Sequence, residues 1–308
     1  MDKKIVFFQK PKNVMLLAVF TTFLWGSAFP CVKIGYRLFQ IQEGDPFNQI
    51  LFAGYRFTLA GILVILFAAY QQKKWILPDK NNIKGIFILG MIQTTLGYVF
   101  FYIGIANTTG IKSSILYSIN AFMAVILAHI FYQNEKLTLR KTLGCLSGFL
   151  GVVLINVKGG CFDSSLSFSG EGMILLAAAS FSTGALLSKN TAQKSDSMMI
   201  TGYQLLLGGV MLILLGIGGN GHLSAFSLEG SLMLLYLSSL SAISFTLWTA
   251  LLKYNQIGKI TVYNFLIPVF GVTLSAVLLN ETFFELKNIL ALVAVCFGIY
   301  IINKPEKV

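Results

Sequence analysis

Polar and aromatic side chains stand in the middle of several long apolar stretches of this sequence, and they are its best candidates for chemistry. Amides and hydroxyls in such places can hydrogen-bond a polar ligand, while Tyr and Trp rings offer faces to apolar or cationic groups. The same side chains can instead serve only to join neighbouring helices. The candidates for a ligand-binding cavity are Trp25, Ser27, Gln93, Tyr98, Tyr117, Asn120, Gln204, Trp248, Tyr263 and Asn264.

Two prolines lie within the same apolar stretches. Because proline has no backbone N–H, Pro30 frees the carbonyl of Gly26, next to Trp25, and Pro268 frees the carbonyl of Asn264. An open carbonyl in apolar surroundings must be satisfied by a neighbour, water or a ligand. Both prolines are therefore hinge candidates beside the cavity, and a plain helix kink satisfied by packing is the alternative.

Charged residues inside the apolar stretches are few. Arg56, Lys33 and Lys189 lie close enough to the ends of their stretches to reach water, so we expect them to snorkel, with pairing to a ligand carboxylate as the alternative. Glu135 and Glu281 fall at junctions between stretches. The sequence places no acidic residue at mid-stretch, so a buried proton relay has no evident carrier.

The motifs of common enzymes and cofactor sites are missing. There is no phosphate-binding GxxxxGK[ST] loop, and the two histidines form neither an HExxH motif nor a triad. Four cysteines without metal-site or redox spacing are best explained as packing residues: Cys31, Cys145, Cys161 and Cys296. We expect no cofactor, no metal and no enzymatic activity. An intramembrane enzyme or flippase acting on a lipid-linked intermediate is the alternative, and it would need ionisable residues converging at one depth.

The elements that must position these residues are membrane spans. Of the 308 residues, 56% are hydrophobic and only 11% are charged, whereas a soluble domain has about 25% charged residues. That composition excludes a soluble enzyme and a nucleic-acid binder, and it indicates an all-α polytopic membrane protein in contact with the lipid bilayer. Stretches of about 20 apolar residues are long enough to cross a bilayer. Ten occur, at about 14–36, 49–71, 83–105, 111–132, 139–157, 171–191, 199–219, 229–252, 260–280 and 286–303.

The basic residues are distributed unevenly between the two sides of the membrane. Most of the 23 Lys and Arg residues fall in the terminal segments and in alternate loops. The positive-inside rule then places both termini in the cytoplasm of a multi-pass cell-membrane protein. The net charge of +11 belongs to that cytoplasmic face.

Short similarities recur five spans apart. Gly54–Gly61 opens the second span and resembles Gly202–Gly209 at the start of the seventh, and Asn134–Glu135 recurs as Asn280–Glu281. Because five is an odd number, two copies of such a unit enter the membrane from opposite sides. Inverted repeats of this kind are typical of secondary transporters, which bind solutes at the midplane between the halves.

The chain resembles the EamA-type members of the drug/metabolite transporter superfamily. The resemblance rests on the 5+5 plan, on Trp25–Phe29, on Pro268, and on the Glu135 and Glu281 junctions followed by Gly-rich spans. It implies a first repeat over residues 1–157, a connecting loop over 158–170 and a second repeat over 171–308. It also implies a cavity lined by spans one, three, four, six, eight and nine. Phe122 departs from the pattern, which often has proline there.

These observations predict a gradient-driven exporter of small organic solutes, such as amino acids or amphipathic metabolites and drugs, working by alternating access. A passive channel is a further alternative, distinguished by flux that does not saturate. A stripe of glycines at Gly144, Gly148 and Gly151 permits close helix packing. That packing would join either the two halves of one chain or two chains of a homodimer.

Overall fold

The structure is a computed structural model that describes residues 3–42, 44–107, 116–156, 167–193, 195–223, 226–279 and 286–304. These residues form helices and no strand, as the composition predicts. In chain order the elements are α1 (Lys3–Gln9), α2 (Pro11–Leu38), α3 (Pro46–Gln72), α4 (Lys80–Leu89), the π-helical η1 (Gly90–Leu96), α5 (Gly97–Ala106), α7 (Ile119–Phe131), α8 (Leu139–Asn156), the π-helical η2 (Phe168–Gly172), α9 (Met173–Gln193), α10 (Ser197–Gly218), α11 (Leu228–Tyr254), α12 (Ile257–Thr261), the 3₁₀-helical η3 (Val262–Phe265), α13 (Leu266–Leu279) and α14 (Leu286–Asn303).

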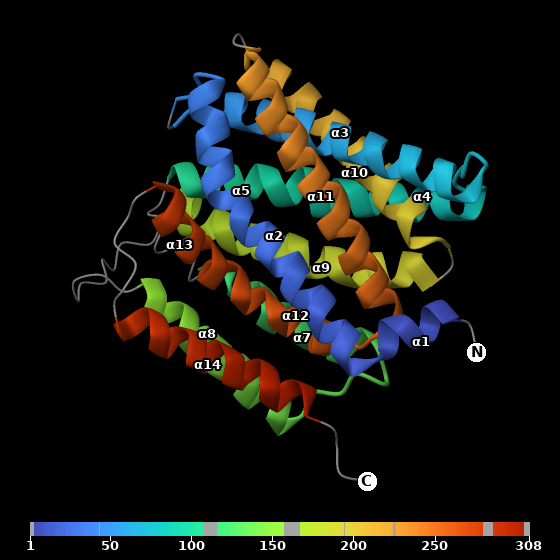
Figure 1. Cartoon of the computed structure of the whole chain (residues 1–308), viewed down its shortest axis with the longest axis vertical. Coiled ribbons are helices and arrows are strands. Elements are labelled where there is room, and N and C mark those ends of the chain that lie inside the picture. The colour runs from blue at the N-terminus through green and yellow to red at the C-terminus, as the bar shows by residue number, and fades with distance from the viewer. Residues whose placement is uncertain are drawn as a thin grey trace.

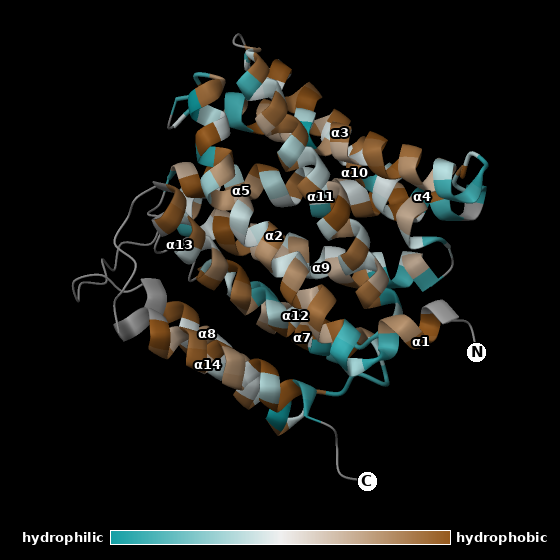
Figure 2. Cartoon of the chain, in the orientation of Figure 1, coloured by the Kyte–Doolittle hydropathy of each residue, from teal (hydrophilic) through white to brown (hydrophobic). Residues whose placement is uncertain are grey.

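Helical structure lies on every predicted span, and each end that the structure describes lies within a few residues of the predicted one. Seven helical segments of the described residues are long and apolar enough to cross a membrane, and two shorter apolar helices, Ile119–Phe131 and Ile289–Asn303, accompany them. Hydrophobic residues run along the helices, while hydrophilic residues gather near α4 and around the junction of α1 and α2 (Figure 2). The count of ten spans remains a prediction, and the start of the fourth span, the 158–166 loop, Cys161 and Glu281 lie outside the described residues.

Aspartates begin the second helix of each predicted repeat. Asp45 accepts a hydrogen bond from the backbone N–H of Asn48 at the start of α3. Asp196 accepts from the N–H groups of Met198 and Met199 at the start of α10. An N-cap of this type satisfies donors that a helix start leaves open. The two helices therefore begin in the same way at opposite faces of the molecule.

The helices α3 and α10 pack against one another through glycines (Figure 1). A Cβ added to Gly61 would lie 2.7 Å from the carbonyl oxygen of Gly202, and one added to Gly54 would lie 2.7 Å from the backbone nitrogen of Ile213. Because residues late in α3 meet residues early in α10, the two helices run antiparallel. This is the relation expected of equivalent helices in an inverted repeat.

The helices α8 and α14 form a second antiparallel pair, which lies at the lower edge of the view in Figure 1. A Cβ added to Gly144 would lie 2.7 Å from the carbonyl oxygen of Gly298, and one added to Gly151 would lie 2.7 Å from the carbonyl oxygen of Ala291. Gly148 faces the ring of Phe265 in η3. The glycine stripe therefore packs within one chain, between its two halves, and it gives no support to a homodimer.

Candidate functional site

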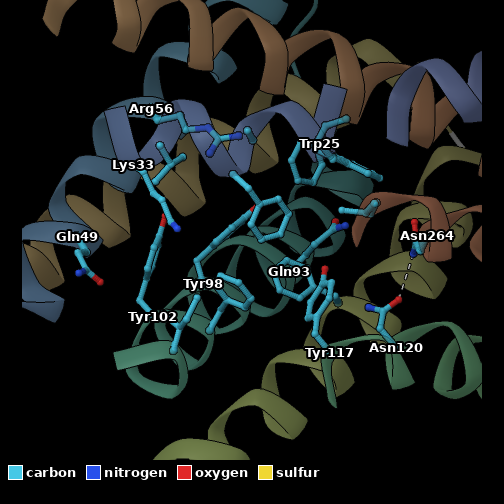
Figure 3. Close-up of a pocket in the computed structure, with 18 of the residues that line it drawn as sticks. Trp25, Lys33, Gln49, Arg56, Gln93, Tyr98, Tyr102, Tyr117, Asn120 and Asn264 are labelled. Carbon is cyan, nitrogen blue, oxygen red and sulfur yellow. Dashed lines mark hydrogen bonds between the residues drawn. The ribbon is translucent and has the colours of Figure 1, made fainter. Parts of the chain in front are cut away.

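A cavity of about 500 Å³ lies between the two halves of the chain (Figure 3). Its walls come from α2, η1, α5, the start of α7, α9, α11, η3 and α13, which are the spans implied by the resemblance, and also from α3. This size falls within the usual range of small-molecule pockets, about 300–1,000 Å³. Among the exposed lining residues, Lys33, Gly44 and Ala106 lie at the face where α2 and α5 end, and they mark the mouth of the cavity there.

Most of the predicted site residues line this cavity. They are Trp25, Gln93, Tyr98, Tyr117, Asn120, Trp248 and Asn264. They reach it from segments far apart in the sequence, and Figure 3 shows Trp25, Gln93, Tyr98 and Tyr117 directed toward the same space. Gln93 belongs to the π-helical η1, an irregularity that is frequent at functional sites.

The other three predicted residues lie elsewhere. The Ser27 hydroxyl donates to the carbonyl of Leu24 and lies 3.3 Å from the Tyr236 hydroxyl, on a face of α2 turned toward α11. Gln204 is buried and accepts a hydrogen bond of 2.8 Å from Thr94. Tyr263 is only 3% exposed and packs in a hydrophobic core. Helical spacing in the sequence could not distinguish the helix faces that carry these three residues from the faces that line the cavity, because all of these faces are largely apolar.

The two asparagines mark the deep end of the cavity, where the halves meet. Asn264 donates from Nδ2 to Oδ1 of Asn120 over 3.2 Å, and the dashed line in Figure 3 marks this bond. Asn120 is also tied to α9, because its carbonyl oxygen accepts from the Ser182 hydroxyl. The Asn264 Oδ1 atom is buried, and no described residue donates to it. The Trp25 Nε1 donor is likewise buried without an acceptor among the described residues.

Two of the three expected snorkelling residues do not snorkel. Arg56 is 5% exposed and lines the cavity, where its Nε donates to the hydroxyl of Ser241 over 2.8 Å and its guanidinium lies 5.0 Å from the ring centre of Phe57. Lys189 is buried in an ion pair. Lys33 is exposed, but it also lines the mouth. Distance from the span end could not reveal these orientations, since it says nothing of which face a side chain occupies.

The remaining lining residues are largely aromatic, and sequence reasoning missed many of them. Phe101, Phe181 and Phe245 carry no polar group, so nothing in the pattern separated them from lipid-facing phenylalanines. Their rings pack edge-to-face: Tyr98 and Tyr117 each contact Phe181, and Trp25 contacts both Phe245 and Trp248. The result is an aromatic wall around the deep part of the cavity.

The opposite face of the molecule is closed by a polar cluster around Lys189 and Glu135. Lys189 Nζ lies 2.5 Å from Glu135 Oε1 and donates to the carbonyl of Asn255. The other oxygen of Glu135 accepts from the backbone N–H of Gly258. Lys189 also lies over the ring of Tyr132. The cluster joins the end of α7 to α9 and to the α11–α12 turn, and thus joins the two halves.

The prolines differ in their surroundings. Pro30 is buried within α2, which continues as a helix on both sides of it. Pro268 follows the 3₁₀ turn η3, which interrupts its span and carries Asn264. Because Pro268 has no backbone N–H, it cannot donate to the carbonyl of Asn264, and an interruption of the helix at this turn is consistent with that missing bond. Whether either position acts as a hinge remains a prediction.

Comparison with known proteins gives a consistent result. A profile of the EamA-like transporter family matches residues 12–157 and 168–304. A chloroplastic WAT1-related protein of Arabidopsis thaliana is 29% identical over 92% of this chain and 68% of its own length. An uncharacterized transporter of Archaeoglobus fulgidus is 29% identical over 88% of this chain and 90% of its own, and the uncharacterized transporter YvbV of Bacillus subtilis is 26% identical over 97% and 94%. One solved crystal structure superposes with a TM-score of 0.78 at 16% identity, covering 93% of this chain and 95% of that one, which shows likeness of fold alone.

Proposed function

The chain belongs to the EamA-like transporter family, and from that premise we propose that it is a secondary transporter of small organic solutes that works by alternating access. It is a membrane transporter of this family with several transmembrane helices. The substrate, the direction and the mechanism are the content of the proposal.

The observation that carries it is a cavity open at one face and closed at the other. The mouth lies by Lys33, Gly44 and Ala106, and the deep end lies at the junction of the halves beside Asn120 and Asn264. At the far face the Lys189–Glu135 ion pair ties the halves together. Alternating access needs two such closures used in turn, and exchanging the shapes of two similar halves provides them at comparable energy.

The orientation follows from the basic residues. With both termini in the cytoplasm, the Lys189–Glu135 pair lies at the cytoplasmic face and the cavity opens to the outside. We propose export as the direction of transport. Because an alternating-access cycle is reversible, the direction of transport needs its own test. If the protein is an exporter, cells lacking it should secrete less of its solute or be more sensitive to a toxic analogue of that solute.

The experiment that tests the function is counterflow in proteoliposomes. Vesicles are loaded with one unlabelled amino acid or aromatic metabolite, and uptake of the labelled solute is followed at increasing concentration. Saturable exchange that depends on the internal solute supports a carrier. Flux that rises linearly with concentration indicates a channel, and a panel without any exchange contradicts the proposal.

Vesicles that contain the protein but no internal solute give the background uptake. The variant Asn303→Ala serves as a matched control. Asn303 lies at the end of α14, away from the cavity, and donates to the carbonyl of Ile299. The variant should exchange solute as the unmodified protein does.

A further inference from the structure

The cavity carries positive charge that no described lining residue balances. Arg56 and Lys33 both line it, whereas no Asp or Glu is among the lining residues that the structure describes. Arginine stays protonated at any physiological pH. A buried charge is costly unless an opposite charge or several hydrogen bonds compensate it. Arg56 is therefore a buried positive charge for which no described lining residue supplies a counter-charge.

The hydrogen bonds that Arg56 makes leave most of its donors free. Its guanidinium has five N–H donors, and among the described residues only Nε has an acceptor, the Ser241 hydroxyl at 2.8 Å. The face of Phe57 contributes a cation–π contact without occupying the terminal nitrogens. Figure 3 shows Arg56 and Lys33 on the same side of the cavity, next to Tyr102. Both cations therefore face the same cavity.

The deep part of the cavity has a different character. Trp25, Tyr98, Phe181 and Phe245 form an aromatic wall, and beside it lie two buried polar atoms, Trp25 Nε1 and Asn264 Oδ1, that have no hydrogen-bond partner among the described residues. Aromatic surroundings favour a ligand with a flat apolar body.

We propose that the solute of this cavity is an organic monocarboxylate with an aromatic or similarly flat apolar body. Its carboxylate binds Arg56, with Lys33 at the mouth, and its body lies toward Trp25. One buried guanidinium balances one carboxylate, and its fork of donors fits the two carboxylate oxygens. A solute cation finds aromatic faces here but no described acidic partner, so the charge of the cavity works against cationic drugs. This inference rests on the proposed function for its biological meaning.

The test uses three probes with the same ring and different charge: 3-phenylpropionate, phenylalanine and phenethylamine. Binding to purified full-length protein in detergent is followed by tryptophan fluorescence. The chain has 3 tryptophans, and Trp25 and Trp248 line the cavity. Trp75 is 66% exposed, so the variant Trp75→Phe leaves only the two cavity tryptophans to report.

We expect 3-phenylpropionate to bind at least about tenfold more tightly than phenethylamine, because a hydrogen bond to a charged group contributes enough for that ratio. Phenylalanine should fall between them. Lys33→Gln and Arg56→Gln should each reduce this preference for the anion. Lys33 is exposed, so its variant reads the charge effect even if Arg56→Gln fails to fold.

Arg37→Gln is the matched control, since Arg37 is exposed one turn beyond Lys33 and does not line the cavity. It should leave the preference unchanged. Equal affinity for the three probes, preference for the amine, or no binding of 3-phenylpropionate would overturn the inference. Because binding is measured without flux, these outcomes are independent of counterflow. If the protein exchanges other solutes but does not prefer the anionic probe, the inference about the solute is wrong and the proposed transport function stands.

Discussion

Asn264 donates a hydrogen bond from Nδ2 to Oδ1 of Asn120 across 3.2 Å, and this bond joins the second half of the chain to the first at the bottom of the cavity. Asn120 is held in turn by α9, to whose Ala178 carbonyl its Nδ2 donates over 3.4 Å. Each asparagine lies at an interruption of its span: Asn120 comes shortly after a turn at Ser118, and Asn264 lies within η3. Interrupted helices at mid-membrane are typical of transporter binding sites.

Asn120→Ala should impair transport more than folding. The variant removes the acceptor of Asn264 Nδ2 and leaves that donor unpaired at the cavity. The loss of such a bond corresponds to about tenfold in an equilibrium constant. We expect counterflow of a substrate to fall by about that factor while the yield of protein in the membrane stays the same.

Asn303→Ala repeats the substitution far from the cavity and should leave both quantities unchanged. If Asn120→Ala lowers membrane yield and transport in parallel, Asn120 is a structural residue and its place in the binding site is wrong.

The Lys189–Glu135 pair should keep the cavity closed at its own face. Replacing Lys189 by Met leaves the buried Glu135 carboxylate without its Lys189 partner, and breaking a buried pair in this way costs about 3–5 kcal/mol. Part of that cost appears as opening of the closed face. A cysteine at Ala185, which lines the cavity one turn before Lys189, should then react with a polar thiol reagent applied from the face of the ion pair.

The charge-reversed double variant, Lys189→Glu with Glu135→Lys, restores an ion pair and should restore protection of the cysteine at Ala185. If the cysteine at position 185 stays protected from the reagent in Lys189→Met, the ion pair does not keep this face closed. The background must lack the native cysteines, of which Cys31 and Cys145 are buried and Cys296 is exposed.

The glycine contact of α3 with α10 should tolerate no side chain. A Cβ on Gly61 would lie 2.7 Å from the Gly202 carbonyl oxygen and 2.8 Å from the Leu206 Cα. Because both are backbone atoms, the helices must separate. We expect Gly61→Val to lower stability in detergent by about 1–3 kcal/mol. Gly218→Ala, where the added Cβ meets nothing within 4 Å, should leave the thermal midpoint unchanged, and equal midpoints for both variants would contradict the close contact.

The sequence predicted the position of the helices well because membrane spans need long apolar runs whatever they pack against. The family resemblance implied the spans that line the cavity, apart from α3, and the mid-span pattern pointed to its asparagines and several of its aromatic residues. The sequence failed on the faces of those spans. Gln204 and Ser27 look like Gln93 in the pattern, but each is satisfied by a neighbouring helix.

The charged residues show the same limit more sharply. Arg56 and Lys189 were both expected to snorkel, because proximity to a span end permits it. In the structure Arg56 binds Ser241, which is remote in sequence, and Lys189 binds Glu135 from the other half of the chain. Such partners arise from the tertiary arrangement, which the spacing of residues along one span does not contain.

The two halves should be threaded through the membrane in opposite directions, and equivalent loops can test this. Lys74 follows α3 in the first half, and His222 follows α10 in the second. Because α3 and α10 run antiparallel, cysteines at these exposed positions lie at opposite faces. In a cysteine-free background, a membrane-impermeant reagent outside the cell should label the variant His222→Cys and spare Lys74→Cys until the membrane is opened. The opposite result would reverse the orientation and place the cavity mouth in the cytoplasm. Labelling of both from one side would contradict the inverted arrangement, and with it the alternating use of the two closures.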